Sequence, residues 1–193
     1  MKTIYVLLVL ITITLLSSCT TSPVEELIET ELESVITTEQ QIIEVTNLTD
    51  TAWGSGSALE EQTFSIEEML IYAIQDEYTA KSEYIMIMEK FDITKPFSNI
   101  YESEGTHISL LIPLFEVYEI SVPEDTSTDH LFEVDTLKES FEIGVIAEIN
   151  NIAMYNLFLT QDLPDDIEAV FIRLRDASEN HLSAFEKNLA KYL

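Results

Sequence analysis

Five ionisable residues fall on the apolar faces of four predicted helices, where a helical bundle normally places hydrophobic side chains. They are Glu77, Glu104, His107, Glu148 and His181. Each belongs to a stripe of residues separated by steps of three and four, which keeps the side chains on one side of a helix. Ionisable groups on a buried face are costly unless they are paired, hydrogen-bonded or bound to metal. The pattern therefore predicts a metal site inside a four-helix bundle.

The stripes define four helices, which cover residues 70–91, 97–114, 141–159 and 167–185. The capping box Ser65-Ile66-Glu67-Glu68 predicts the start of the first helix, and Pro96 and Pro164 suit the starts of the second and fourth. Pro113 is expected to kink or end the second helix. Residues 119–134 then form a long crossover between two helix pairs, and strand patterns are nearly absent. The predicted fold class is an all-α, antiparallel four-helix bundle with a long crossover between the second and third helices.

The two halves of this bundle look like copies of one helical hairpin. Glu77 precedes Tyr84 by seven residues, and Glu148 precedes Tyr155 by seven. From the Glu to the His of each hairpin the distance is 30 residues in the first copy and 33 in the second. Such a repeat is typical of bundles in which two helices each give a Glu and the other two each give a Glu-x-x-His to a pair of metal ions. The i, i+3 spacing of that motif aims both side chains inward within one turn.

Composition narrows the class of protein. Nine Lys and Arg against 36 Asp and Glu give a net charge of −27, which argues against nucleic acid as a partner and against charge-driven adhesion to anionic lipid. The acidity would concentrate cations near the surface, although solubility alone also explains it. A nucleophile elbow, a phosphate loop and zinc-knuckle spacing are all missing, so hydrolase and nucleotide-binding functions have no support.

The N-terminus has the pattern of an export signal. Lys2 is followed by an apolar run from Thr3 to Leu16 that is too short for an ordinary transmembrane helix. Residues 1–18 are therefore predicted to be a signal peptide, and Leu16-Ser17-Ser18-Cys19 resembles a bacterial lipobox. An ordinary secretory signal with an incidental cysteine is the alternative. Because Cys19 is the single cysteine of the chain, we expect it to be lipidated and to anchor the protein outside the cytoplasm, in the cell envelope.

An acidic tether is predicted to follow the anchor, over residues 19–62, and the bundle to occupy residues 63–193. The tether is rich in Thr and Glu and has no Lys or Arg, which favours disorder. The predicted partner is thus the membrane, reached through Cys19, with a homodimer left open.

The bundle resembles the ferritin-like superfamily and, more narrowly, a family described as domain of unknown function 2202. The matching segments are Asp76-Glu77-Tyr78 with Ala80 and Tyr84, Phe97-Ser98-Asn99-Ile100, Ser103-Glu104-Gly105-Thr106-His107, Ala147-Glu148 with Asn151-Ile152, and Ser178-Glu179-Asn180-His181-Leu182 with Ala184-Phe185. The resemblance implies a ferritin-like bundle and no established activity.

One position departs from the dinuclear iron pattern of that superfamily. The fourth helix has Ser178 where a Glu is expected, which leaves three carboxylates and two imidazoles. Glu179 is rotated by about 100° and cannot replace it. A mononuclear site is therefore at least as plausible as a dinuclear one. Oxygen and imidazole ligands suit iron, the first choice, or manganese or zinc.

Three further side chains are expected around the site without binding the metal directly. Ser178 should lie beside the ligands, while Tyr84 and Tyr155 lie two turns from the Glu of their own helices. Core packing with a satisfied hydroxyl is the default role of the tyrosines, and electron relay is the alternative. His130, in the polar crossover, is expected to be solvated.

Three hypotheses for function follow from the sequence. The first is a non-haem metal oxidoreductase that reacts with oxygen or peroxide. The second is a lipid-anchored protein that binds or handles metal without turnover, so enzymatic activity stays undecided. The third is a metal-free structural or interaction module, in which the five residues survive as a buried hydrogen-bond network.

Overall fold

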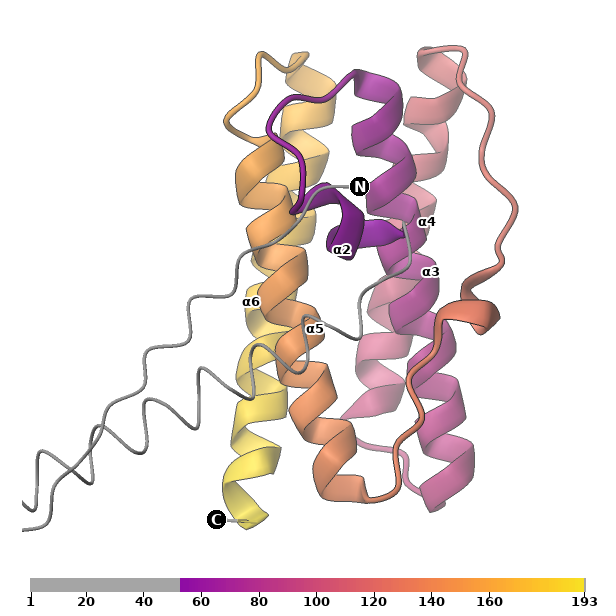
Figure 1. Cartoon of the computed structure of the whole chain (residues 1–193), viewed down its shortest axis with the longest axis vertical. Helices are drawn as coiled ribbons and strands as arrows, with labels where there is room; N and C mark the ends of the chain where they lie inside the picture. The colour runs from indigo at the N-terminus through magenta and orange to yellow at the C-terminus, as the bar shows by residue number, and fades with distance from the viewer. Residues whose placement is uncertain (1–52, 193) are drawn as a thin grey trace, which may run out of the picture. The chain divides into compact units, whose positions relative to one another are not determined.

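The computed structural model describes residues 53–192, which form helices and no strand (Figure 1). Its elements are the short helix α2 (Gly54–Ala58), the long helices α3 (Ile66–Phe91), α4 (Phe97–Val117), α5 (Leu137–Phe158) and α6 (Asp165–Leu189), and the 3₁₀ turns η1 (Ser127–His130) and η2 (Ala190–Tyr192). The predicted signal peptide, the lipidated Cys19 and most of the predicted tether lie outside the described residues.

The four long helices form two antiparallel hairpins. Helix α3 packs mainly on α4, and α5 packs mainly on α6, while α3 also contacts α5 and α4 also contacts α6. Short connections join the helices within each hairpin, whereas the segment that links α4 to α5 runs back along the outside of the bundle (Figure 1). The predicted all-α antiparallel four-helix bundle with a long crossover is therefore confirmed.

Two apolar cores fill the bundle, one toward each end. One core joins the first halves of α3 and α6 to the second halves of α4 and α5, and includes Phe158 and Phe171. The other joins the opposite halves and includes Phe97 and Phe185. Complete burial of each of these rings stabilises the fold by about 1.5–3 kcal/mol. The five ionisable residues occupy the level between the two cores, where all four helices are within reach.

Most helix ends follow the predicted signals. Ser65 caps α3 in a complete capping box with Glu68, and Pro96 and Pro164 directly precede α4 and α6. Pro113 is the exception, because α4 runs through it to Val117, and the expectation that it ends the helix is wrong. Pro113 is exposed to solvent, so water can hydrate the carbonyl of the preceding helical turn, which has no amide hydrogen of Pro113 to accept.

Residues 53–62 belong to the folded part, although the sequence assigned them to a disordered tether. Helix α2 packs against α3 and α5, and Ala58 is completely buried in the first core. His130 is also placed differently from the prediction. Its ring stacks on Trp53 with 4.1 Å between the ring centroids, and its Nδ1 atom is buried, so this histidine is not simply solvated.

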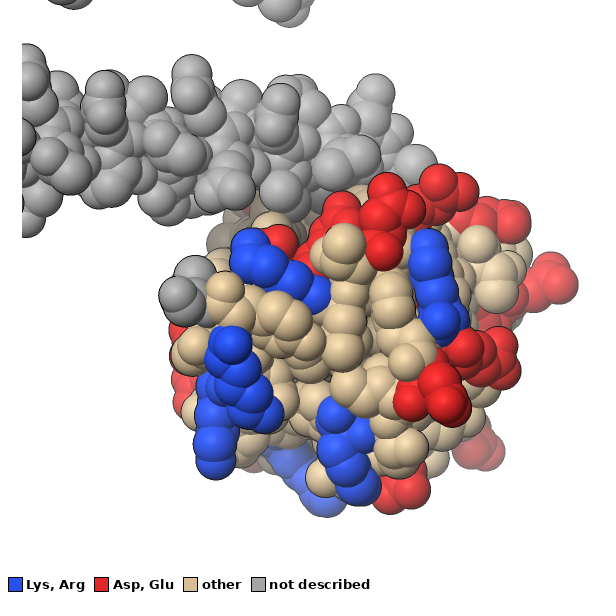
Figure 2. All heavy atoms as spheres, turned by 90° about the horizontal axis from the view of Figure 1, so that it is seen from below, with Lys and Arg blue, Asp and Glu red and all other residues tan. Residues whose placement is uncertain are grey.

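Basic side chains gather at the end of the bundle that holds the C-terminus. They lie around an uncharged centre, and acidic side chains occupy the rest of the rim (Figure 2). The basic residues near this end are Lys90, Lys95, Lys138, Lys187 and Lys191. They lie at helix ends, away from the ionisable residues in the middle of the bundle. Among the described helices, none combines the length and the apolar character needed to cross a membrane.

Candidate metal centre

All five predicted ligands meet in the middle of the bundle. Helix α3 gives Glu77, α4 gives Glu104 and His107, α5 gives Glu148, and α6 gives His181. Their exposure does not exceed 7%, so these side chains are almost completely removed from solvent. Residues from four helices, up to 104 positions apart in the chain, thus form one buried polar cluster.

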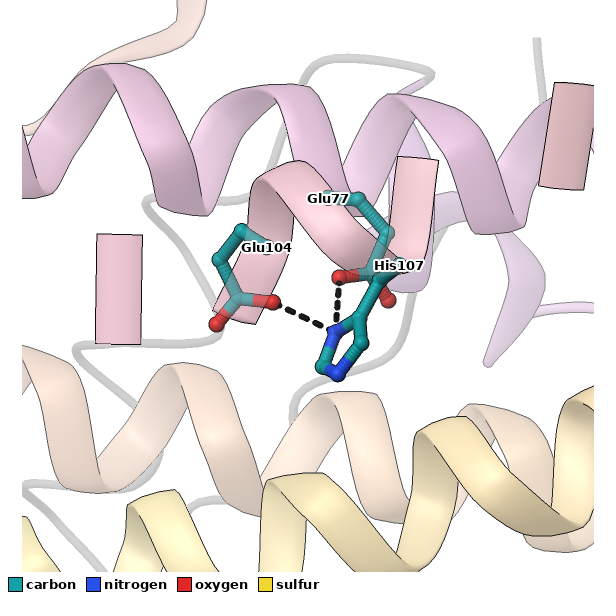
Figure 3. Close-up of side chains that lie close together, drawn as sticks. All are labelled: Glu77, Glu104 and His107. Atoms are coloured by element: carbon teal, nitrogen blue, oxygen red, sulfur yellow. Dashed lines mark hydrogen bonds and ion pairs between the residues drawn. The ribbon is translucent and has the colours of Figure 1, made fainter. Parts of the chain in front are cut away.

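The first half of the cluster combines Glu77, Glu104 and His107. The Nδ1 atom of His107 lies 2.9 Å from Oε2 of Glu77 and 2.6 Å from Oε2 of Glu104, so the imidazole sits between two carboxylates (Figure 3). The other ring nitrogen, Nε2, is 3.2 Å from Oγ of Ser103. This serine fixes the ring orientation from the side that faces away from the carboxylates.

The second half combines Glu104, Glu148 and His181. The Nδ1 atom of His181 lies 3.1 Å from Oε1 of Glu104 and 3.5 Å from Oε1 of Glu148. It is buried and forms no hydrogen bond with acceptable geometry. The rings of His107 and His181 are nearly parallel, with 5.6 Å between their centroids. A nitrogen that lies near two carboxylates without bonding to either is an arrangement that suits a cation between the three groups.

Glu104 connects the two halves, because one of its oxygens faces His107 and the other faces His181. Each half offers two carboxylate oxygens and one imidazole nitrogen, and within each half the ligand atoms lie within 4.8 Å of one another. The structure thus brings together two overlapping three-ligand groups that share one carboxylate. Such hard oxygen and borderline nitrogen donors can hold divalent iron, manganese or zinc.

The two tyrosines reach across to the opposite hairpin. The hydroxyl of Tyr84 on α3 donates to Oε1 of Glu148 on α5 at 2.9 Å, and the hydroxyl of Tyr155 on α5 donates to Oε1 of Glu77 on α3 at 2.7 Å. Each tyrosine belongs to a different apolar core. Their hydroxyls are therefore satisfied, and each orients a candidate ligand carboxylate from one end of the bundle.

Ser178 lies beside the cluster and bonds away from it. Its hydroxyl donates to Oδ1 of Asn151 at 2.6 Å, and it also lies 3.1 Å from the carbonyl of Leu174. The side-chain amide of Asn151 donates to Oδ2 of Asp76 at 2.6 Å. Ser178 is thus part of a separate chain of polar side chains, which connects α6, α5 and α3.

The charges in the cluster depend on one another. Burial lowers the pKa of His107, but the carboxylates of Glu104 and Glu77 outweigh this effect and raise the pKa to about 10. Burial likewise opposes the protonation of His181, and Glu104 and Glu148 raise its pKa to about 10. Both imidazoles are therefore protonated at neutral pH in the metal-free protein. A metal ion must displace these protons to reach the nitrogens.

The carboxylates respond to the same environment. Burial and the charge of Glu104 raise the pKa of Glu77 to about 7, although His107 opposes the rise. Burial also raises the pKa of Glu148. For Glu104, burial favours the neutral form, but the two imidazoles beside it hold its pKa below the ordinary value. Glu104 is thus the carboxylate that stays ionised in the centre of the cluster.

Sequence reasoning did not assign a role to several residues near the cluster. Ser103 bonds to the candidate ligand His107, and Asn151 bonds to Asp76, which directly precedes Glu77. Only the spacing of these residues, one to four positions from a ligand, could have indicated such roles. Glu83 on α3 is 4% exposed, and burial raises its pKa to about 8, but it belongs to neither three-ligand group.

Comparison with known proteins supports the helical fold. The chain is similar to the uncharacterised protein MJ0754 of Methanocaldococcus jannaschii, with 29% identity over 157 residues that cover 70% of this chain and 82% of that protein. The crystal structure of the hypothetical protein MJ0754 matches with a TM-score of 0.60 and 26% identity, covering 68% of this chain and 85% of that chain. No protein-family model matches, so the resemblance to the ferritin-like superfamily remains an expectation. The chain therefore resembles a helical protein that is itself described only as uncharacterised.

Proposed function

We propose that this protein binds two metal ions in the middle of its bundle, with Glu104 as the shared ligand. Glu77 and His107 would complete one site, and Glu148 and His181 the other. The observation that carries the proposal is the pair of overlapping three-ligand groups, each with two carboxylates and one imidazole. This arrangement favours the dinuclear alternative over the mononuclear one, even though Ser178 replaces the fourth carboxylate.

Two details of the cluster fit a metal better than a closed hydrogen-bond network. His181 Nδ1 is buried close to two carboxylates but forms no hydrogen bond, so this nitrogen can bind a metal ion that displaces its proton. The Nε2 atom of His107 has Ser103 as a partner, so its Nδ1 atom can ligate while the opposite nitrogen is held. Metal-bound histidines usually have such a partner on the second nitrogen.

The donor set and the ferritin-like resemblance favour iron, with manganese and zinc as alternatives. Bound iron would supply one-electron chemistry toward oxygen or peroxide. Two tyrosine hydroxyls and Ser103 would orient the ligands, and the two apolar cores would exclude water from either side. Turnover is a further step beyond metal binding, and oxygen and peroxide consumption by the loaded protein tests it directly.

A metal-free module is the competing proposal, and one observation favours it. The histidines and carboxylates already form ion pairs across all four helices, so the bundle can hold the cluster without metal. If this is its only role, apolar substitutions that replace a carboxylate together with its partners, such as Glu77→Leu with His107→Leu and Tyr155→Phe, should leave stability unchanged or raise it, because apolar residues often replace complete buried ion pairs at no cost.

We also propose that the protein is exported and anchored to the membrane by a lipid on Cys19. The apolar N-terminal run and the lipobox-like sequence support this location. Metabolic labelling with a fatty acid should mark the wild-type chain and not Cys19→Ser. Label retained by that variant, or no label in the wild type, would exclude the anchor.

Elemental analysis of the full-length chain tests metal binding. The protein is loaded with ferrous iron under argon, and loose metal is then removed. We expect about two iron atoms per chain, since there are two ligand groups. Glu104→Gln should retain little or none, while Glu83→Gln, which neutralises another buried Glu outside both groups, should retain the wild-type amount. A wild-type chain without iron, manganese or zinc would leave the metal-free module as the function.

A further inference from the structure

The segment before the bundle is held on α3 by side chains that reach out to its backbone. The amide of Gly54 donates to Oε1 of Gln75 at 3.2 Å, and the amide of Ser55 donates to Oδ1 of Asp76 at 2.9 Å. The indole of Trp53 donates to Oγ1 of Thr79 at 2.7 Å. Residues 53–61, here called the α2 segment, are thus attached along two turns of α3.

Gly54 lets this segment approach α3 closely. Its φ angle is +55°, in the left-handed region, and a Cβ atom at this position would lie 2.7 Å from Oδ1 of Asp76. A side chain here would therefore meet both backbone strain and a direct clash with the carboxylate. At Gly105 of α4, by contrast, the nearest atom to an added Cβ is Nζ of Lys81 at 3.9 Å.

Asp76 connects the α2 segment to the interior of the bundle. Its Oδ1 atom accepts from Ser55, and its Oδ2 atom accepts from Asn151 of α5 at 2.6 Å. Asn151 in turn accepts from Ser178 of α6 at 2.6 Å. Asn151 and Ser178 are 6% and 2% exposed, so water cannot readily replace these bonds. The result is a continuous chain of hydrogen bonds from the α2 segment to α6.

Each residue in this chain is close in sequence to a candidate metal ligand. Asp76 directly precedes Glu77 on α3, Asn151 follows Glu148 by three residues on α5, and Ser178 precedes His181 by three on α6. Residues three apart lie on neighbouring parts of one helix face. The chain therefore links the three helices that carry these ligands at the level of the metal centre.

We propose that docking of the α2 segment and metal binding stabilise each other, with Asp76, Asn151 and Ser178 as the positioning residues that connect them. The inference rests on the proposed metal binding and adds its regulation. Release of the segment removes the Ser55 amide from Asp76, and the bonds that hold α3, α5 and α6 at a fixed spacing then loosen. Coupling between two sites is reciprocal. Bound metal should therefore raise the equilibrium constant for docking of the segment by the same factor by which docking raises the affinity for metal.

The coupling gives residues 53–61 a role in controlling the affinity of the site for metal. Coupling between two sites typically changes the affinity for a ligand by roughly 5- to 150-fold. Release of the segment breaks one of the three bonds in the chain, so we expect a change in metal affinity near the lower end of this range, about tenfold.

The test uses zinc as a redox-silent probe and the full-length chain. Gly54→Ala should undock the segment and weaken zinc binding by about tenfold. Gly105→Ala, the same chemical change at a position where an added Cβ makes only ordinary contacts with Lys81, should not change zinc binding. In the wild type, zinc should slow hydrogen exchange of the amides in residues 53–61. In Asn151→Ala, which cuts the chain of bonds, Gly54→Ala should have no further effect on affinity.

The outcomes separate the two proposals. The coupling would be overturned, and metal binding left intact, if the wild type and Gly54→Ala bind zinc equally well and zinc does not change the rate of hydrogen exchange in residues 53–61. A wild-type chain that binds no zinc, iron or manganese would overturn the proposed function and the coupling together. Circular dichroism of both glycine variants checks that the four long helices remain folded.

Discussion

Neutralising Glu104 should weaken both metal sites, whereas neutralising Glu77 or Glu148 should weaken one site each. This follows from the position of Glu104, which places one oxygen by His107 and the other by His181. Substitution by Gln keeps the size of the side chain and removes its charge. The wild type should bind two ions tightly, Glu104→Gln should bind none tightly, and Glu77→Gln and Glu148→Gln should each bind one tightly.

The size of the effect can be worked out from the geometry. The ligand atoms of each group lie within 4.8 Å of one another, so an ion among them would lie within about 4 Å of the Glu104 carboxylate. Two unit charges at about 4 Å interact by about 4 kcal/mol at an effective dielectric constant of about 20. Because each 1.4 kcal/mol changes an equilibrium constant about tenfold, each ion should bind at least about a thousandfold more weakly.

Competition between the protein and a chromophoric zinc chelator measures both affinities in one titration. Glu83→Gln is the matched control, because it also neutralises a buried Glu of the bundle and lies outside both ligand groups. Loss of both ions from Glu77→Gln, or one ion still bound at wild-type affinity in Glu104→Gln, would refute the assignment of Glu104 as the shared ligand.

Three other predictions concern the metal-free cluster. The pKa values of His107 and His181 are raised from 6.5 to about 10, so the stability that their protonation adds is complete below pH 6.5 and is lost as the pH rises through about 10. Thermal unfolding should therefore occur at a lower temperature at pH 10.5 than at pH 6.5. An unfolding temperature that is the same at both pH values would contradict this account. Tyr155→Phe should reduce the free energy of unfolding by about 1.5–3 kcal/mol in urea titrations, because it removes a hydrogen bond to a buried carboxylate, while Tyr101→Phe, on a partly exposed tyrosine, should change it by less than about 0.5 kcal/mol. Ser178→Glu would add a fourth carboxylate at a position with 2% exposure, so the metal-free variant should melt below the wild type and gain more from zinc in a thermal melt than the wild type does.

The tyrosines show where reasoning from one helix at a time stops. Tyr84 follows Glu77 by seven positions, so the sequence placed its hydroxyl away from the Glu of its own helix. The hydroxyl instead reaches Glu148, 64 positions away, and Tyr155 reaches Glu77, 78 positions away. The predicted packing with a satisfied hydroxyl is confirmed, but the exchange of partners between hairpins depends on how the two hairpins are placed side by side.

The α2 segment shows a different limit. Composition favoured disorder up to residue 62, because the region is acidic, lacks Lys and Arg and ends in a Gly/Ser run. The Gly/Ser run is in fact the docked part, since its small residues allow the backbone to lie against Gln75 and Asp76. A glycine that permits close packing and a glycine that permits flexibility look the same in a sequence.

The sequence by itself determined the four helices, the crossover and the buried level of the five ionisable residues. These features depend on the helical repeat, which fixes the face of each side chain from spacing within a single segment. Only the tertiary structure decided that Glu104 serves both halves of the cluster, that each tyrosine bonds to the other hairpin, and that Asp76, Asn151 and Ser178 form a chain of bonds. The physical reason is that helical periodicity sets which side chains point inward, whereas the partner of each oxygen and nitrogen depends on the distances and rotations between helices far apart in the chain.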